Sequence, residues 1–155
     1  MPKPAPAVDD ADAARARAAM VARLHEAGHL PPGPVSEALL ALPRQVLMPQ
    51  AYVRRSAPDE TPPRWDLLDW SAPEDRDELL HVLYSGDSVA IQHDREPLLG
   101  RARGTRSGGA MTSMSSVTGM TAGLLQELDL EPKRLLGHGA ESSGRRSPAV
   151  RPTAG

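Results

Sequence analysis

Proline and glycine interrupt this chain so often that they limit how much of it can pack into one core. The 155 residues include 16 prolines and 13 glycines. Aromatic side chains, which bury the most area per residue, are scarce, because the chain has two tryptophans, two tyrosines and no phenylalanine. We therefore expect a core that does not extend over the whole length of the chain.

Three segments between these interruptions have helical patterns. A helix is predicted from the capping residues Asp9 and Asp10 to about Ala27, ended by Gly28. A short second helix has Pro34 in its first turn. A third begins near residues 116–118 and runs to about Leu130. Their apolar faces are formed by Met20, Val21, Leu24 and Ala27 in the first, by Val35, Ala38, Leu39 and Leu42 in the second, and by Met120, Leu124 and Leu128 in the third.

The segments between these helices are predicted to be mainly extended or irregular. Residues 54–78 are acidic and rich in proline, with Trp65, Leu67, Leu68 and Trp70 as their apolar anchors. Residues 79–92 contain β-formers and favour extended chain with a turn at Gly86 and Asp87. Residues 100–113 are basic and rich in glycine, which predicts a flexible loop outside the core.

Charge and composition exclude several classes of function. A formal charge of -2 and a pI near 6.2 do not favour nucleic acid or an anionic membrane as partner. The absence of cysteine rules out disulfides, thiolate metal sites and a cysteine nucleophile. No segment approaches the roughly 20 apolar residues of a membrane span, and the first residues lack the apolar core of a secretory signal. The sequence predicts a cytoplasmic protein.

The segment "HEAGH", His25 to His29, matches the H-E-x-x-H pattern of zinc peptidases. In such enzymes both histidines lie one turn apart on a continuous helix, and the glutamate activates a zinc-bound water. Here Gly28 lies inside the pattern, prolines follow it, and His81, His93 and His138 offer no clear third ligand. We therefore expect a helix end with two solvated histidines, keep the zinc hydrolase as an alternative, and predict no metal site.

A run of hydroxyl side chains in "TSMSSVTGMTAGLLQELDLEP", residues 112–132, immediately precedes the third predicted helix. The free N–H groups and the positive dipole end of a helix N-terminus attract anions, so a substrate carboxylate would suit this position. The simpler alternative is that Ser116 or Thr118 caps the helix. Further along, Gly137 and Gly139 in "GHGAESSG" give only a weak indication of a cofactor loop, because Glu141 follows where small residues would be needed.

The order of these motifs resembles the N-terminal half of the protein-L-isoaspartate O-methyltransferase family. The resemblance covers about residues 15–136, and its most specific parts are "LPRQVLMPQAY" and the serine segment with its helix. It implies an α/β, Rossmann-like S-adenosylmethionine methyltransferase that transfers a methyl group to an aspartyl or isoaspartyl carboxylate of a protein or peptide. The insert "PRWDLLDW" and the long loop at 94–110 are similar to the branch that modifies ribosomally made, macrocyclised peptides.

The resemblance also implies a role for one residue and shows two departures from the family pattern. Ser116 corresponds to the family serine that places the substrate carboxylate, and Thr118 stands where the family has a proline. The family aspartate near the tyrosine corresponds to Gly86, with Asp87 one position later.

The cofactor-binding part of the family pattern is not recognisable in this sequence. The family motif "RVLEIGTGTG" is replaced by "RLLGHGAESSG", and the chain ends at Gly155, whereas one βαβ unit takes about 30 residues. We therefore expect a truncation or altered reading frame near residue 137, with Gly137 and Gly139 as remnants of the glycine loop. This predicts a mostly α-helical fragment that lacks most of the sheet, does not bind S-adenosylmethionine and is inactive alone.

This interpretation divides the chain into four parts. They are a disordered lead at 1–9, a substrate-side region at 10–130, the start of a first sheet strand at 131–136 and a disordered tail at 137–155. It also predicts that the apolar stripe of the last helix is left exposed. A noncatalytic module that binds a peptide or a partner protein remains the alternative to the methyltransferase fragment.

Overall fold

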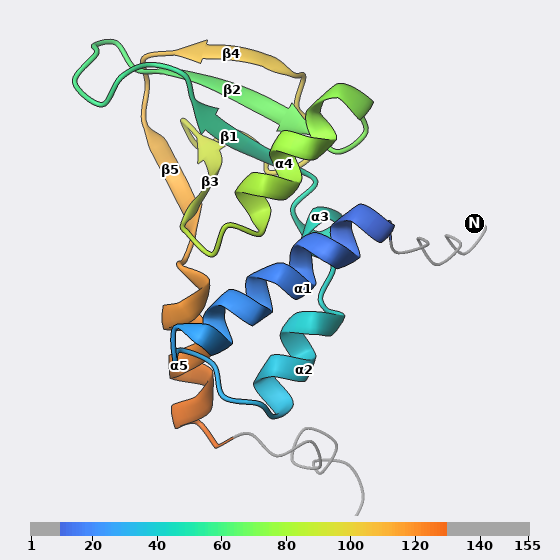
Figure 1. Cartoon of the computed structure of the whole chain (residues 1–155). Coiled ribbons are helices and arrows are strands. Elements are labelled where there is room, and N and C mark those ends of the chain that lie inside the picture. The colour runs from blue at the N-terminus through green and yellow to red at the C-terminus, as the bar shows by residue number, and fades with distance from the viewer. Residues whose placement is uncertain (1–9, 130–155) are drawn as a thin grey trace, which may run out of the picture.

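The computed structural model describes residues 10–129, which form a helical layer and a curved sheet (Figure 1). Its elements follow in the order α1 (Ala11–Glu26), α2 (Pro34–Ala41), α3 (Arg44–Leu47), β1 (Gln50–Arg54), β2 (Arg64–Asp69), the 3₁₀ turn η1 (Pro73–Asp75), α4 (Arg76–Leu83), β3 (Val89–His93), β4 (Gly104–Ser107), β5 (Met111–Ser115) and α5 (Thr118–Glu127). The predicted lead at 1–9, the strand start at 131–136 and the tail at 137–155 lie outside the described residues.

Helix α1 confirms the predicted capping and helical pattern. The carboxylate of Asp10 accepts a hydrogen bond of 2.8 Å from the N–H of Asp12, which satisfies one free donor of the first turn. The helix ends at Glu26, and Gly28 follows with a φ of +73°, a conformation that favours glycine. Met20, Val21 and Leu24 are buried as the spacing predicts, whereas Ala27 is exposed.

The sheet contradicts the expected fold class. Within residues 10–129, five strands pair in the order β4-β2-β1-β3-β5, and every pairing is antiparallel. The described region is therefore not a mostly helical fragment without a sheet, nor does it show the parallel sheet of a Rossmann-like fold. The expectation was wrong because the strands are short and their pairing joins segments distant in sequence, such as Leu67 with Gly104 and Val89 with Ser115.

Helix α4 corrects the prediction of extended chain over residues 79–92. Residues up to Leu83 are helical, and only Val89–His93 forms a strand, after the predicted turn around Gly86. Leu79, Leu80 and Leu83 are buried on one side of α4, next to the sheet (Figure 1). Burial of this helical face outweighs the weak preference of single residues such as Val82 for strands.

Strands β4 and β5 correct the prediction that residues 100–113 are a flexible loop. Every residue of β4 is exposed or half-buried, and so is every residue of β5, so neither strand carries the apolar alternation that marks a strand in a sequence. Instead, each pairs with a better buried neighbour: β4 with β2, and β5 with β3. These polar segments are therefore strands because their backbones form hydrogen bonds with β2 and β3 at the two edges of the sheet.

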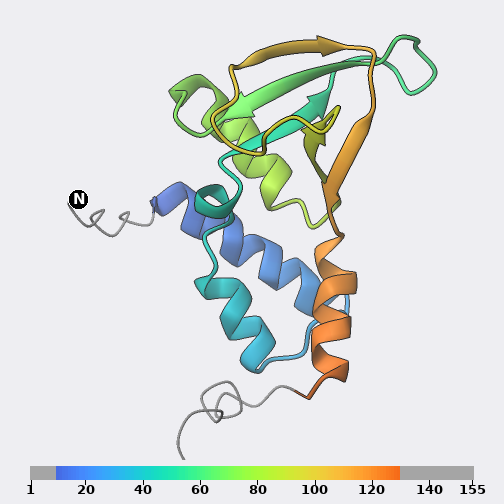
Figure 2. The same cartoon turned by 180° about the vertical axis from the view of Figure 1, so that it is seen from behind.

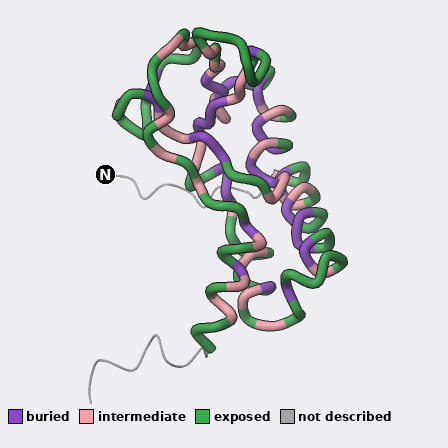
Figure 3. Tube along the Cα trace, turned by 90° about the vertical axis from the view of Figure 1, so that its left-hand side faces the viewer, coloured by how far each residue is buried: buried purple, intermediate pink, exposed green. Residues whose placement is uncertain are grey.

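The two faces of the sheet contribute to different clusters. Ala51 and Leu68, which are paired across β1 and β2, join the main core formed with α1 and α4. Their neighbours Tyr52 and Leu67 point to the opposite face, where they pack with Ala90. The main core therefore lies between the sheet and the helices, and Figure 3 shows buried residues along this boundary.

Strand β5 leaves the sheet and continues into α5, which lies beside α1 and α2 (Figure 2). Helix α5 begins at Thr118, as predicted, and buries Ala122. The predicted exposure of its stripe is confirmed, since Met120, Leu124 and Leu128 are 59, 62 and 63% exposed. No helix in the described part of the chain combines the length and apolar character needed to cross a membrane.

Candidate functional site

The junction between β5 and α5 holds the serine that the family resemblance singles out. Ser116 follows the last residue of β5, and its side chain is exposed. The N-cap of α5 is Val117, and no side chain caps the helix, so the prediction that Ser116 or Thr118 does so is wrong. Within residues 10–129 the hydroxyl of Ser116 has no hydrogen-bond partner, which leaves it available to a ligand.

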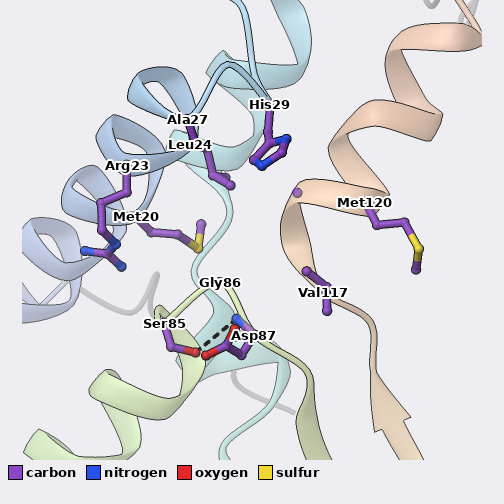
Figure 4. A pocket seen from close by; sticks show the side chains of 11 residues that line it. Met20, Arg23, Leu24, Ala27, His29, Ser85, Gly86, Asp87, Val117 and Met120 are labelled. Atoms are coloured by element: carbon purple, nitrogen blue, oxygen red, sulfur yellow. Dashed lines mark hydrogen bonds between the residues drawn. The ribbon is translucent and has the colours of Figure 1, made fainter.

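A pocket of about 450 Å³ opens beside this junction (Figure 4). Its walls come from the C-terminal half of α1 with the following turn, from the loop at 85–87 and from the start of α5. The lining residues are Met20, Arg23, Leu24, Ala27, His29, Ser85, Gly86, Asp87, Val117, Gly119 and Met120. The volume falls within the range of about 300–1,000 Å³ that is usual for small-ligand pockets, and apolar side chains alternate with a few polar ones.

Hydrogen bonds fix the polar loop at 85–87 against its neighbours. The N–H of Asp87 donates to Oγ of Ser85 over 3.1 Å, as drawn in Figure 4. The N–H of Thr118 donates to the carbonyl of Gly86 over 2.9 Å, which ties the loop to the first turn of α5. Gly86 and Asp87, where the sequence departs from the pattern it resembles, thus line the pocket together with Val117. Ser116, the residue before Val117, is adjacent to the wall but is not one of the lining residues.

Two buried side chains, Arg44 and Tyr84, connect the walls of this pocket. The N–H of Arg44 donates to the Tyr84 hydroxyl over 2.9 Å, and this hydroxyl donates to Oε1 of Gln45 over 2.6 Å. The guanidinium of Arg44 donates to Oγ1 of Thr118 over 2.9 Å and to Oγ of Ser115 over 3.1 Å. It also lies 4.0 Å from Sδ of Met20. Arg44 therefore reaches both α1 and the β5–α5 junction.

The charges around the pocket are mixed. Arg23 and His29 are basic and exposed, and the guanidinium of Arg23 donates to the carbonyl of Tyr84 over 2.6 Å. Asp87 is acidic and exposed on the loop. Burial lowers the pKa of the Arg44 guanidinium from its usual value, although Tyr84 opposes this shift. None of the ion pairs within residues 10–129 involves Arg44, and the side-chain acceptors of its guanidinium there are neutral.

The "HEAGH" segment does not form the geometry of a zinc peptidase. Helix α1 ends at Glu26, so His29 lies beyond the helix that carries His25. His25 shares a hydrogen bond of 2.9 Å with Ser36 of α2, whereas His29 lines the pocket. Residues 10–129 contain no group of three or more histidine, aspartate and glutamate side chains placed to hold a metal ion.

Residues 10–129 do not form a Rossmann-type site for S-adenosylmethionine. A Rossmann-type site needs a glycine turn between a parallel strand and a helix, so that the backbone can approach the cofactor closely. All strand pairings within residues 10–129 are antiparallel, and β5 enters α5 through Ser116 and Val117. The predicted remnants of the glycine loop, Gly137 and Gly139, lie outside the described residues.

Sequence reasoning assigned no role to Arg44 and Tyr84. The segment "LPRQVLMPQAY" was distinctive as a pattern, but a single arginine between apolar residues does not reveal its partners. These partners are 71 and 74 positions away, at Ser115 and Thr118, and only the tertiary fold brings them together. A charged residue within an otherwise apolar connector was the signal that could have identified Arg44.

Comparison of the chain with models of protein families, with curated proteins and with solved structures finds no match.

Proposed function

We propose that residues 10–129 form the substrate-binding part of a protein-L-isoaspartate-type O-methyltransferase. In this proposal the pocket receives an aspartyl or isoaspartyl residue of a protein or peptide, and Ser116 holds one oxygen of its carboxylate. The observation that carries the proposal is the position of Ser116: an exposed hydroxyl without a partner among the described residues, next to a pocket wall.

The chemistry of the reaction agrees with such a site. A carboxyl group with an ordinary pKa of about 4 is ionised at neutral pH, so it needs no strong base to act as a nucleophile. Its second oxygen must be aligned with the methyl group, and a positioned hydrogen bond from a hydroxyl supplies part of this alignment. In this proposal S-adenosylmethionine would supply the methyl group and would be held by a unit other than residues 10–129.

A noncatalytic module that binds a peptide or a partner protein is the second candidate, and the purely antiparallel sheet of the described region favours it. The two candidates differ in what they must recognise. The substrate-binding part of a carboxyl methyltransferase has to distinguish a carboxylate from an amide, whereas a docking module has no such requirement.

Calorimetric titration of the full chain with two short capped peptides tests the proposal. One peptide contains a single aspartate and the other an asparagine in its place. We expect tighter binding of the aspartyl peptide, and we expect Ser116→Ala to weaken that binding about tenfold, as for a hydrogen bond to a charged group. The asparaginyl peptide should lose less affinity, because a hydrogen bond to its uncharged amide oxygen is weaker.

Ser107→Ala is the matched control, because Ser107 is an exposed serine at the end of β4, far from α5 in Figure 1. It should leave both affinities unchanged. Titration with S-adenosylmethionine should give no binding. Equal affinity for the two peptides would favour the docking module, and micromolar binding of S-adenosylmethionine would contradict the division of roles proposed here.

A further inference from the structure

The guanidinium of Arg44 lies directly behind the serine segment. Arg44 is 8% exposed, and its partners come from both sides of the β5–α5 junction: Ser115 from the last position of β5 and Thr118 from the first position of α5. Ser116 is one of the two residues between them. Arg44 therefore holds both ends of the short backbone segment that carries Ser116 between β5 and α5.

The direction of these hydrogen bonds determines what the junction can bind. A guanidinium has donors only, so the hydroxyls of Ser115 and Thr118 both act as acceptors toward Arg44. Each hydroxyl keeps its own hydrogen, which can be donated to a further acceptor. Thr118 is buried, but Ser115 is only half-buried and lies next to the exposed Ser116. The hydroxyls of Ser115 and Ser116 are therefore the groups through which this junction can donate a hydrogen bond to a ligand.

The positive charge of Arg44 also favours a negatively charged ligand at this junction. Arg44 is a buried cation whose side-chain partners within residues 10–129 are all neutral. A hydroxyl that accepts a hydrogen bond from a cation becomes a stronger donor, because polarisation along a chain of hydrogen bonds is cooperative. An ionised carboxylate matches such donors, since it has acceptor oxygens only and carries the opposite charge. A side-chain amide matches these hydroxyl donors less well, because its NH₂ group is itself a donor and the amide carries no charge.

We infer that Arg44 is a positioning residue that makes the β5–α5 junction selective for a carboxylate, acting through the hydroxyl of Ser115. This inference rests on the proposed function and specifies its ligand: an ionised aspartyl or isoaspartyl side chain, preferred over the corresponding amide. Arg44 acts from behind the junction, and the hydroxyls of Ser115 and Ser116 touch the ligand.

The test is the ratio of the affinities of the aspartyl and asparaginyl peptides, measured by titration of the full chain. Arg44→Met keeps an unbranched side chain in place but removes the charge and the donors. We expect it to lower the affinity ratio about tenfold or more, as expected when a hydrogen bond to a charged group is lost. Arg44→Lys should retain more of the ratio than Arg44→Met, because the charge remains while the planar fork is lost. A purely structural role of Arg44 would reduce both affinities together and leave their ratio unchanged.

Ser115→Ala keeps the inference testable if Arg44→Met does not fold, as judged by circular dichroism. We expect it to lower the ratio about tenfold, through loss of one hydrogen bond to the carboxylate. Ser113→Ala is the matched control, because Ser113 is a half-buried serine two positions earlier on the same strand and should leave the ratio unchanged.

The outcomes separate this inference from the proposed function. If the unaltered chain does not prefer the aspartyl peptide, the proposed function itself fails. If Ser116→Ala weakens binding of that peptide but a folded Arg44→Met or Ser115→Ala variant keeps the ratio of the unaltered chain, only the role of Arg44 is overturned.

Discussion

Glu96, in the loop that connects β3 to β4, joins the side chains of Tyr52 and Arg101. Its carboxylate accepts hydrogen bonds from the Tyr52 hydroxyl and from Nη1 of Arg101, the latter over 2.9 Å. Arg101 in turn donates to Oε1 of Gln50. Burial raises the pKa of Tyr52 to about 12, and the hydrogen bond to Glu96 contributes to this shift. Burial alone would also raise the pKa of Glu96, but the bonds from Tyr52 and Arg101 bring it below its usual value.

At neutral pH we expect Glu96→Gln to lower the free energy of unfolding by about 2 kcal/mol, because it leaves Arg101 buried without its counter-charge. The contribution of a carboxylate with a depressed pKa is present above its ordinary pKa, here 4.5, and is lost as the pH falls through the folded-state value. The difference between variant and unaltered chain should therefore shrink at pH 3. Urea unfolding at pH 7 and pH 3 measures it.

Glu60→Gln is the control for this prediction, since Glu60 pairs with Arg64 at the surface, and an exposed pair contributes about 0.5 kcal/mol. A loss of stability for Glu96→Gln that is as large at pH 3 as at pH 7 would show that the charge of Glu96 is not what stabilises the network.

At the level of elements, the turn between β4 and β5 depends on its glycines. Gly108 and Gly109 have φ angles of +73° and +69°. The turn is fixed to the end of β3: the N–H of Ala110 donates to the Asp94 carboxylate over 2.8 Å, and the His93 ring lies 2.8 Å from the carbonyl of Gly108. A Cβ on Gly109 would lie 2.6 Å from the buried His93 ring, which is too close for a real contact.

We expect Gly109→Ala to destabilise the protein by about 3 kcal/mol, from backbone strain at positive φ together with the clash against His93. Gly28→Ala provides the comparison, because Gly28 has the same kind of φ, +73°, but no atom within 4 Å of an added Cβ. It should lose about 1 kcal/mol, from strain alone. Thermal unfolding of both variants measures the difference, and equal losses would show that the turn moves to accept the methyl group.

For the molecule as a whole, the exposed face of α5 is the feature with the clearest consequence in solution. Met120, Leu124 and Leu128 recur every four residues along the helix, and Val117 is also exposed where the helix begins. Contiguous apolar side chains of this kind favour association, because contact removes them from water. We therefore expect the full chain to associate reversibly as its concentration rises.

Leu124→Glu should reduce this association and change the free energy of unfolding by less than about 0.5 kcal/mol, because the side chain is mostly exposed. Leu99→Glu is a matched control: Leu99 is also 62% exposed, but it lies in the loop between β3 and β4. Sedimentation equilibrium at several concentrations distinguishes the two. If both variants associate like the unaltered chain, the face of α5 is not the surface involved.

Local patterns in the sequence determined α1 and the start of α5. Both depend on contacts within a few residues: the cap by Asp10, the glycine after α1, and apolar residues spaced one helical turn apart. The exposure of Met120, Leu124 and Leu128 also agrees with the prediction made from the sequence. Ser116 was identified through the family resemblance, and its exposed position is compatible with the predicted role.

Only the tertiary structure decided the antiparallel sheet, helix α4 and the contacts of Arg44. Strands β4 and β5 have polar sequences and exist because β2 and β3 offer them backbone partners. Residues 79–83 became helical because Leu79, Leu80 and Leu83 are buried together against the sheet and α1. Arg44 bonds to residues more than 70 positions away. Residue spacing in a sequence indicates which side chains lie on the same face of one helix or strand. The sheet, α4 and the contacts of Arg44 depend instead on which distant segments pack together and exclude water.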